Sequence, residues 1–303
     1  MGNIDLFTRN KQTVREMNTK LIERYLGVRK GSLRYIGLPA STLTDILQWK
    51  EFFAHFSAVE RGKPGEEFRY QHELMLTAMR NGIAGRLTLL RGELDEILLK
   101  GRDGFGNPVL YPYDVVSLDY SGGLVYKDAS GNARRPESIA KLLEEQAAKD
   151  HNFLLFISTN LDNEDQGEVR NALQDIEREL NKLGITISPT IQAFLSHELE
   201  EARLKVYVPY LIRNLAARRY QCEHAKAIDY EGNRGTRMIN FSVWLKRTKG
   251  HVAGRPSRQT IIHILNITAY CCANGDLAET DFGIPKVVVP TPILTVQNNE
   301  NID

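Results

Sequence analysis

The sequence predicts an α/β protein in which a mostly parallel sheet lies between two layers of helices. Five short apolar segments alternate with stretches of helical character between residues 33 and 184. Such alternation is typical of strand–helix–strand units with right-handed crossovers, which build a parallel sheet. Two further segments, 225–230 and 236–247, flank a glycine-containing turn and predict an antiparallel hairpin at one edge. We therefore expect a seven-stranded sheet in a three-layer α/β/α sandwich.

The strands are expected where apolar runs end in glycine or polar residues. The five parallel ones are predicted at 33–38, 54–62, 86–90, 113–120 and 152–159. The fifth is an unbroken apolar run, which is typical of a strand buried on both faces. In the hairpin, apolar Ile239, Phe241 and Val243 alternate with Asn240 and Ser242, which is the period of a strand.

Helices are expected between these strands, over 42–53, 66–81, about 93–99 and from Pro136 onward, because proline is common at the first helical position. The clearest helix spans 166–184 and ends at Gly184. Its apolar residues recur at spacings of three and four: Val169, Leu173, Ile176, Leu180 and Leu183. Helical character continues to about 217, with a kink or break at Pro209. Residues 1–31 fit one or two amphipathic helices.

Length and composition suit a globular protein with a real core. The 303 residues are 42% hydrophobic and 25% charged. We divide them into an N-terminal helical segment (1–32), a Rossmann-like domain (33–250) and a C-terminal extension (251–303). No run approaches the ~20 apolar residues that span a bilayer, so no membrane partner is expected. The charged N-terminus and the three cysteines favour a cytoplasmic protein without disulfides.

Glycines and acids stand at the ends of the first four predicted strands. Parallel sheets bind ligands at the carboxyl ends of their strands, so these residues are candidate site residues. Glu60, after the second strand, is placed to bind a ribose diol. Glu93, after Gly92 and the third strand, could accept from an adenine amine. Asp119 and Tyr120 end the fourth strand, where a substrate would meet a cofactor.

The order of AVERG, LLRGEL and YDVVSLDYSGG at successive strand ends resembles class I S-adenosylmethionine-dependent methyltransferases. The resemblance covers about residues 33–247. It implies a seven-stranded sheet with the last strand antiparallel, and S-adenosylmethionine as cofactor. It further implies Asp119 and Tyr120 as catalytic residues, with Tyr120 stacking on a flipped base. The implied cofactor-binding residues are Gly37, Ser41, Glu60, Gly92 and Glu93.

The first motif of that family is a glycine-rich turn with an acid just before it, whereas the equivalent stretch Tyr35–Ser41 holds one glycine, Gly37. This departure keeps open a decayed binding or regulatory subunit of a larger complex. A metal-dependent α/β enzyme built on Glu60, Glu93 and Asp119 is a further alternative. Each residue also has a structural alternative: Glu60 could pair with Arg61, Glu93 could mark a helix N-terminus, and Tyr120 could pack in the core.

A basic segment follows Glu231. No acidic residue occurs before Asp276, although the chain's net charge is +1. This segment predicts contact with nucleic acid phosphates, while an acidic protein partner or a solvated loop would give the same pattern. The candidate contacts are Arg237, Lys246, Arg247, Lys249, Arg255 and Arg258.

The cysteines and histidines fit no zinc spacing. Cys271 and Cys272 are adjacent, and Cys222 is followed by His224 in a C-x-H pattern. We expect no metal site and buried thiols. Motifs for serine hydrolysis, phosphate loops, zinc proteases and dinucleotide binding are missing from the sequence.

Overall fold

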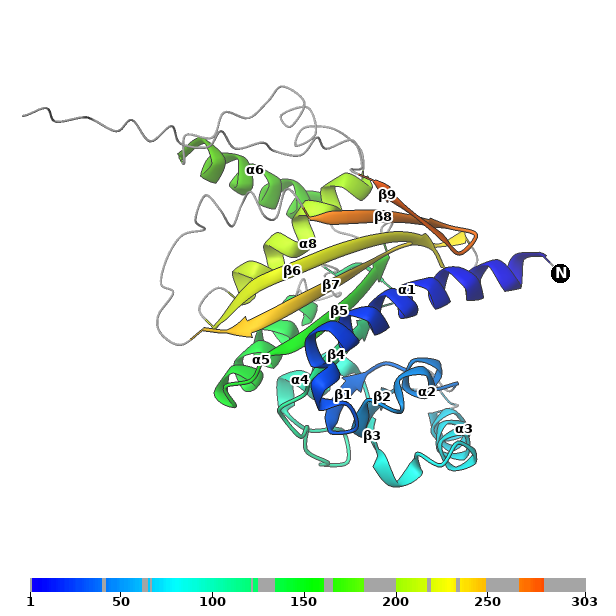
Figure 1. Cartoon of the computed structure of the whole chain (residues 1–303). Helices are drawn as coiled ribbons and strands as arrows, with labels where there is room; N and C mark the ends of the chain where they lie inside the picture. The colour runs from blue at the N-terminus through cyan, green and yellow to red at the C-terminus, as the bar shows by residue number, and fades with distance from the viewer. Residues whose placement is uncertain are drawn as a thin grey trace, which may run out of the picture.

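In the computed structural model, helices cover both faces of one nine-stranded sheet (Figure 1). The strand order is β3-β2-β1-β4-β5-β7-β6-β8-β9. The predicted α/β sandwich is therefore confirmed. The structure describes residues 2–39, 42–61, 65, 67–120, 122–124, 134–160, 166–182, 200–216, 219–232, 235–248 and 267–280.

The five predicted parallel strands form one half of the sheet. They are β1 (Leu33–Gly37), β2 (Phe53–Glu60), β3 (Leu87–Arg91), β4 (Val115–Asp119) and β5 (Phe153–Asn160). They pair in parallel, with β1 between β2 and β4. Every residue of β5 is buried, as its unbroken apolar run predicts. The hairpin of β6 (Tyr220–Glu231) and β7 (Arg237–Arg247) is also present, and β7 lies antiparallel beside β5.

The predicted strand count and the position of the hairpin are wrong. Two more strands, β8 (Thr268–Ala273) and β9 (Asp276–Thr280), extend the sheet beyond β6. The hairpin is consequently internal, and β9 is an edge strand. Every β9 side chain is exposed or half-buried. An edge strand of this kind has a weak apolar pattern, which is why the sequence did not reveal it.

The helices form two layers with separate cores. One face carries α1 (Gly2–Leu26), α2 (Thr44–Trp49) and α3 (Glu67–Arg80). The other carries α4 (Leu94–Lys100), α5 (Arg134–Ala148), α6 (Gln166–Lys182) and α8 (Glu200–Ala216). The N-terminal segment is one helix, and α8 continues through Pro209. The helix expected over 42–53 is shorter because Phe53 already belongs to β2.

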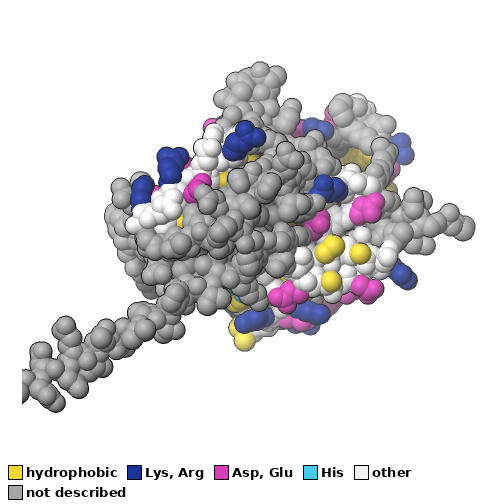
Figure 2. Space-filling view, turned by 90° about the horizontal axis from the view of Figure 1, so that it is seen from above, with side chains coloured by type: hydrophobic (Ala, Val, Ile, Leu, Met, Phe, Trp, Pro, Cys, Tyr) yellow, Lys and Arg dark blue, Asp and Glu magenta, His cyan; other side chains and the backbone are white. Residues whose placement is uncertain are grey.

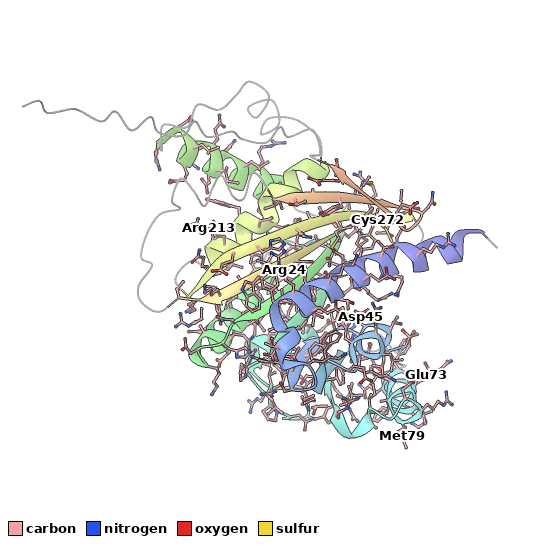
Figure 3. All side chains as sticks on the ribbon, viewed as in Figure 1. Arg24, Asp45, Glu73, Met79, Arg213 and Cys272 are labelled. Carbon is pink, nitrogen blue, oxygen red and sulfur yellow. The ribbon has the colours of Figure 1, made fainter. Side chains whose placement is uncertain are left out.

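Helix α1 is hydrogen-bonded to the hairpin of β8 and β9. The Asn10 side-chain oxygen accepts a hydrogen bond from the Gly275 N–H at 2.9 Å, and the Thr13 hydroxyl donates to the Gly275 carbonyl at 2.8 Å. Cys272, labelled in Figure 3, is buried beside the same asparagine. The β8–β9 hairpin therefore holds the N-terminal half of α1 on the sheet.

Asp229 makes the stability of this extension pH-dependent. It lies in β6, opposite Ile239 of β7 and Cys271 of β8. Burial raises the pKa of its carboxyl to about 6, from an ordinary 3.8. Since the folded state binds this proton more tightly than the unfolded state, stability falls as pH rises from about 4 to about 6. We expect Asp229→Asn to be the more stable protein at neutral pH and to lose that advantage near pH 4. Urea unfolding at both pH values measures this, and an equal difference at both would contradict it.

A helix that spans a bilayer is long and predominantly apolar. None of those in the described part of the chain is both long enough and apolar enough to cross a membrane. On the described surface in Figure 2, basic and acidic side chains are interspersed.

Candidate functional site at the carboxyl edge of the sheet

The strand-end residues Gly37, Glu60 and Asp119 lie on three neighbouring strands. In the ladder, Gly37 is opposite Ala58 of β2 and Ser117 of β4. Because alternate residues of a strand share a face, Glu60 and Asp119 lie on the same face as Gly37. The topology thus places two of the three predicted strand-end acids at one edge and on one face.

A polar hollow opens at this edge, beneath α1. It encloses about 370 Å³ of empty space, including the part open to solvent. Strands β4, β5, β6 and β7 supply one wall, and α1 and α2 supply the other. Figure 3 shows Asp45 of α2 close to α1. Polar or charged lining residues include Lys11, Arg15, Asp45, Ser117, Asp119 and Asn240.

Two ion pairs connect α1 to the acids of the hollow. Lys11 Nζ lies 3.7 Å from Asp119 Oδ2, with the side chains 28% and 36% exposed. Arg15 donates a hydrogen bond to Asp45. Burial raises the pKa of Asp45, and the charge of Arg15 opposes that rise. Since Lys11 and Arg15 are four residues apart, one face of α1 carries both cations over the hollow.

Hydrogen-bonded side chains line the strands beneath α1. Asn240 Nδ2 donates to Ser158 Oγ at 3.0 Å, and Ser242 Oγ donates to Asn18 Oδ1 at 2.7 Å. The sequence showed Asn240 and Ser242 as the polar positions of an alternating strand, but both are buried. In the sequence, the signal for this site was the presence of these polar residues in a strand. The helix that faces them also carries the polar residues Asn18 and Arg15.

Tyr120 lies on the opposite face from Asp119, because consecutive strand residues point to opposite faces. Its side chain is 4% exposed, its hydroxyl donates to Asp95 Oδ1 at 3.1 Å, and Arg135 lies over its ring. The predicted base-stacking role is therefore not available to Tyr120 in this structure. The alternative that it packs in the core describes it correctly.

The third strand end also differs from the cofactor site that the resemblance implies. Glu93 pairs with Arg61, and both side chains are more than half exposed. This pair raises the pKa of the Arg61 guanidinium. Gly92 has a φ of 136°, so the turn before α4 itself requires glycine. Glu60 is half-buried, and its carbonyl accepts from the Gly92 N–H at 3.3 Å. Ser41 lies outside the described residues.

The turn after β1 does not fit S-adenosylmethionine bound in the manner of the family. A Cβ added to Gly37 would overlap the Tyr35 hydroxyl and would lie 2.7 Å from the Ser117 carbonyl oxygen. The glycine is thus required by the packing of the protein itself. Pro39 is buried, and Leu38 packs against the core of the opposite face. The described residues of this turn consequently leave no open space for a cofactor beside Gly37.

The metal-dependent alternative gains no support from the described residues. Within them, no group of three histidine, cysteine, aspartate or glutamate side chains could hold a metal ion. Of the cysteines, Cys272 is buried and Cys222 is half-buried, but Cys271 is exposed, so the expectation of buried thiols is wrong for Cys271.

The described residues of the predicted basic segment are engaged within the protein. Lys246 Nζ lies 2.9 Å from Glu223 Oε1. Arg247 donates to the carbonyls of Ala147, Arg219 and Thr248 at 2.7–3.2 Å. Arg237 begins β7 and is half-buried. Lys249, Arg255 and Arg258 lie outside the described residues.

Arg247 is therefore expected to act on stability. Arg247→Ala removes three hydrogen bonds to backbone carbonyls and should lower the free energy of unfolding by about 1–3 kcal/mol. The neighbouring Lys246→Ala removes one exposed ion pair and should change it by less than about 1 kcal/mol. Urea unfolding compares the two variants. Equal losses of unfolding free energy in the two variants would show that the hydrogen bonds of Arg247 to the carbonyls do not stabilise the fold.

The solved structures that are similar to this chain are distant ones. No family model matches the chain, and no curated protein matches it. The O-methyltransferase TomG from Streptomyces achromogenes, solved with S-adenosylmethionine, is 12% identical with a TM-score of 0.39, over 79% of this chain and 89% of that chain. An O-methyltransferase from Bacillus cereus, solved with SAH, is 10% identical with a TM-score of 0.40, over 80% and 92%. The N-methyltransferase NodS from Bradyrhizobium japonicum is 7% identical with a TM-score of 0.40, over 78% and 97%.

These TM-scores are below 0.5, so the fold class rests on the sheet itself. Five parallel strands, an antiparallel β7 beside β5 and helices on both faces are the arrangement that the resemblance implies. The sheet therefore has the arrangement that the resemblance implies, extended by β8 and β9.

Proposed function

We propose that this chain is a binding or regulatory protein on a methyltransferase-like fold, and that it does not bind S-adenosylmethionine at the β1 turn. The observation that carries this proposal is the Tyr35 hydroxyl beside Gly37, in the space that a glycine turn would leave open. Glu93, the residue implied to lie near the adenine, pairs with Arg61 in this structure.

The hollow beside Asp119 is where this protein would bind its ligand. It lies at the carboxyl edge, where open α/β sheets bind ligands. Asp119 and Lys11 are both partly exposed and are separated by a loose 3.7 Å contact, so both can exchange that contact for a ligand. The buried hydroxyl and amide groups around them suit a polar ligand with hydrogen-bond donors and acceptors.

A second candidate is a methyltransferase that acts on nucleic acid. One observation favours it: Asp119 ends β4 in a hollow and is 36% exposed, so it could orient an acceptor amine there. This candidate requires S-adenosylmethionine to bind with Tyr35 displaced from Gly37. The two candidates therefore predict different affinities for S-adenosylmethionine, which can be measured.

Thermal melts of the full chain with S-adenosylmethionine, S-adenosylhomocysteine and magnesium distinguish them. A ligand at a hundredfold excess over its Kd adds ~2.7 kcal/mol of stability, which raises Tm by several degrees. We expect no rise with any of the three. A rise with either nucleoside favours the methyltransferase and contradicts our proposal. A rise with magnesium alone favours a metal-dependent enzyme and also contradicts it.

A further inference from the structure

The loop between α4 and β4 presents an aromatic ring to solvent on a rigid support. Phe105 is 67% exposed. The buried Asp103 carboxylate accepts hydrogen bonds from the backbone N–H groups of Arg91, Phe105 and Asn107 at 2.8–3.1 Å. It also accepts from Asn107 Nδ2 at 2.8 Å. Phe105 is therefore exposed on a loop at the end of β3 that these hydrogen bonds hold in place.

Positive charge without a carboxylate partner lies beside this ring. The Arg91 guanidinium carbon is 4.9 Å from the Phe105 ring centroid. Arg102 is exposed in the same loop. Two acids lie near Arg91 in the fold: Glu60 is opposite it in the β2–β3 ladder, and Glu93, two residues later, pairs with Arg61. Among the described residues, no carboxylate pairs with Arg91 or Arg102.

We propose that Phe105, Arg91 and Arg102 form a surface that binds single-stranded nucleic acid. A base would stack on the exposed part of the Phe105 ring, and the guanidinium groups would pair with the flanking phosphates. Aromatic rings accept every base in this way, and arginine adds both charge and stacking. The charge of the two arginines favours a polyanion that also carries flat rings over an apolar protein partner.

This surface is distinct from the predicted basic segment and from the hollow at Asp119. It lies at the β3 end of the sheet, whereas the predicted basic segment begins at β7, several strands away. It includes neither Gly37 nor the hollow at Asp119.

Fluorescence anisotropy of the full chain with fluorescein-labelled oligo-dT and oligo-U of about 12 nucleotides tests this proposal. We expect binding that weakens steeply as salt is raised, because phosphate contacts release counterions. Phe105→Ala should weaken the affinity by roughly tenfold, since a stacked base contributes on the order of 5- to 150-fold. Arg91→Gln should weaken binding and flatten its salt dependence.

The matched control is Phe68→Ala in α3. Phe68 is 78% exposed, and the described residues place no cation over its ring, so its loss should leave the affinity unchanged. Equal Tm values for the wild type and both phenylalanine variants would verify that each is folded. Binding of either oligonucleotide with the expected loss at Phe105 supports the proposal, and the two probes show whether DNA or RNA is preferred. The proposal is overturned if neither oligonucleotide binds, if Phe105→Ala binds like the wild type, or if an acidic peptide alone binds through Phe105.

Discussion

Replacing Gly37 by alanine is expected to lower the free energy of unfolding by about 1–3 kcal/mol or more. The new methyl group would overlap the Tyr35 hydroxyl and would lie 2.7 Å from the Ser117 carbonyl oxygen. Tyr35 is fully buried, with its ring against Trp49 and Phe53, so it has little freedom to move away. Urea unfolding of the wild type and Gly37→Ala measures the loss.

Two further variants show whether Tyr35 is the cause. Gly85→Ala is the matched control, because a Cβ at Gly85 would meet nothing within 4 Å, and it should leave stability nearly unchanged. Adding Tyr35→Phe to Gly37→Ala removes the overlapping hydroxyl and should recover part of the loss, while the contacts at 2.7 Å with the ring carbon Cζ and with the Ser117 carbonyl remain. A turn kept open for a cofactor would give the opposite pattern, in which Gly37→Ala folds normally and loses ligand affinity.

Replacing Asp114 by alanine is expected to cost about 3 kcal/mol of stability, because it leaves several polar groups without their acceptor. The Asp114 side chain is 3% exposed and pairs with Arg29. It also accepts from the Arg34 backbone N–H at 2.8 Å and from His151 Nε2 at 2.9 Å. These contacts connect the residues before β4 to β1 and to the start of β5. Urea unfolding at neutral pH measures the change.

The control for Asp114 is an exposed ion pair. Arg69 and Glu73 of α3 are 71% and 44% exposed, and Glu73→Ala should change the free energy of unfolding by less than about 1 kcal/mol. The loss of unfolding free energy for Asp114→Asn should lie between the losses for Asp114→Ala and Glu73→Ala, since an amide can accept fewer of the same hydrogen bonds. If Asp114→Ala were as mild as Glu73→Ala, the cluster would not stabilise this end of the sheet.

The half of the fold that the sequence predicted best is the half with strong apolar runs. The β5 run and the strand-to-helix alternation from 33 to 184 indicate a parallel sheet because few other structures bury such segments. The β8–β9 extension could not be predicted in the same way. Its last strand, Asp276–Thr280, has two acids and mostly exposed side chains, and it is held by pairing with β8.

The candidate site was predictable in position but not in composition. Strand order brings Glu60 and Asp119 to one edge, as the sequence implied. The residue pattern predicts one site for Asp119 and Tyr120, whereas the pleat of the strand directs their side chains to opposite faces. Lys11 and Arg15 come from a helix far away in sequence, so no local pattern links them to Asp119. The overlap at Gly37 depends on where the Tyr35 side chain points, which the residue pattern alone does not give.

A crystal structure of the protein grown with saturating S-adenosylmethionine tests the closed β1 turn most directly. We predict that the Tyr35 hydroxyl stays against Gly37 and that electron density for the nucleoside is missing between Gly37 and Glu60. Density for S-adenosylmethionine along the turn, with the Tyr35 side chain moved away from Gly37, would contradict this account and would favour an active methyltransferase.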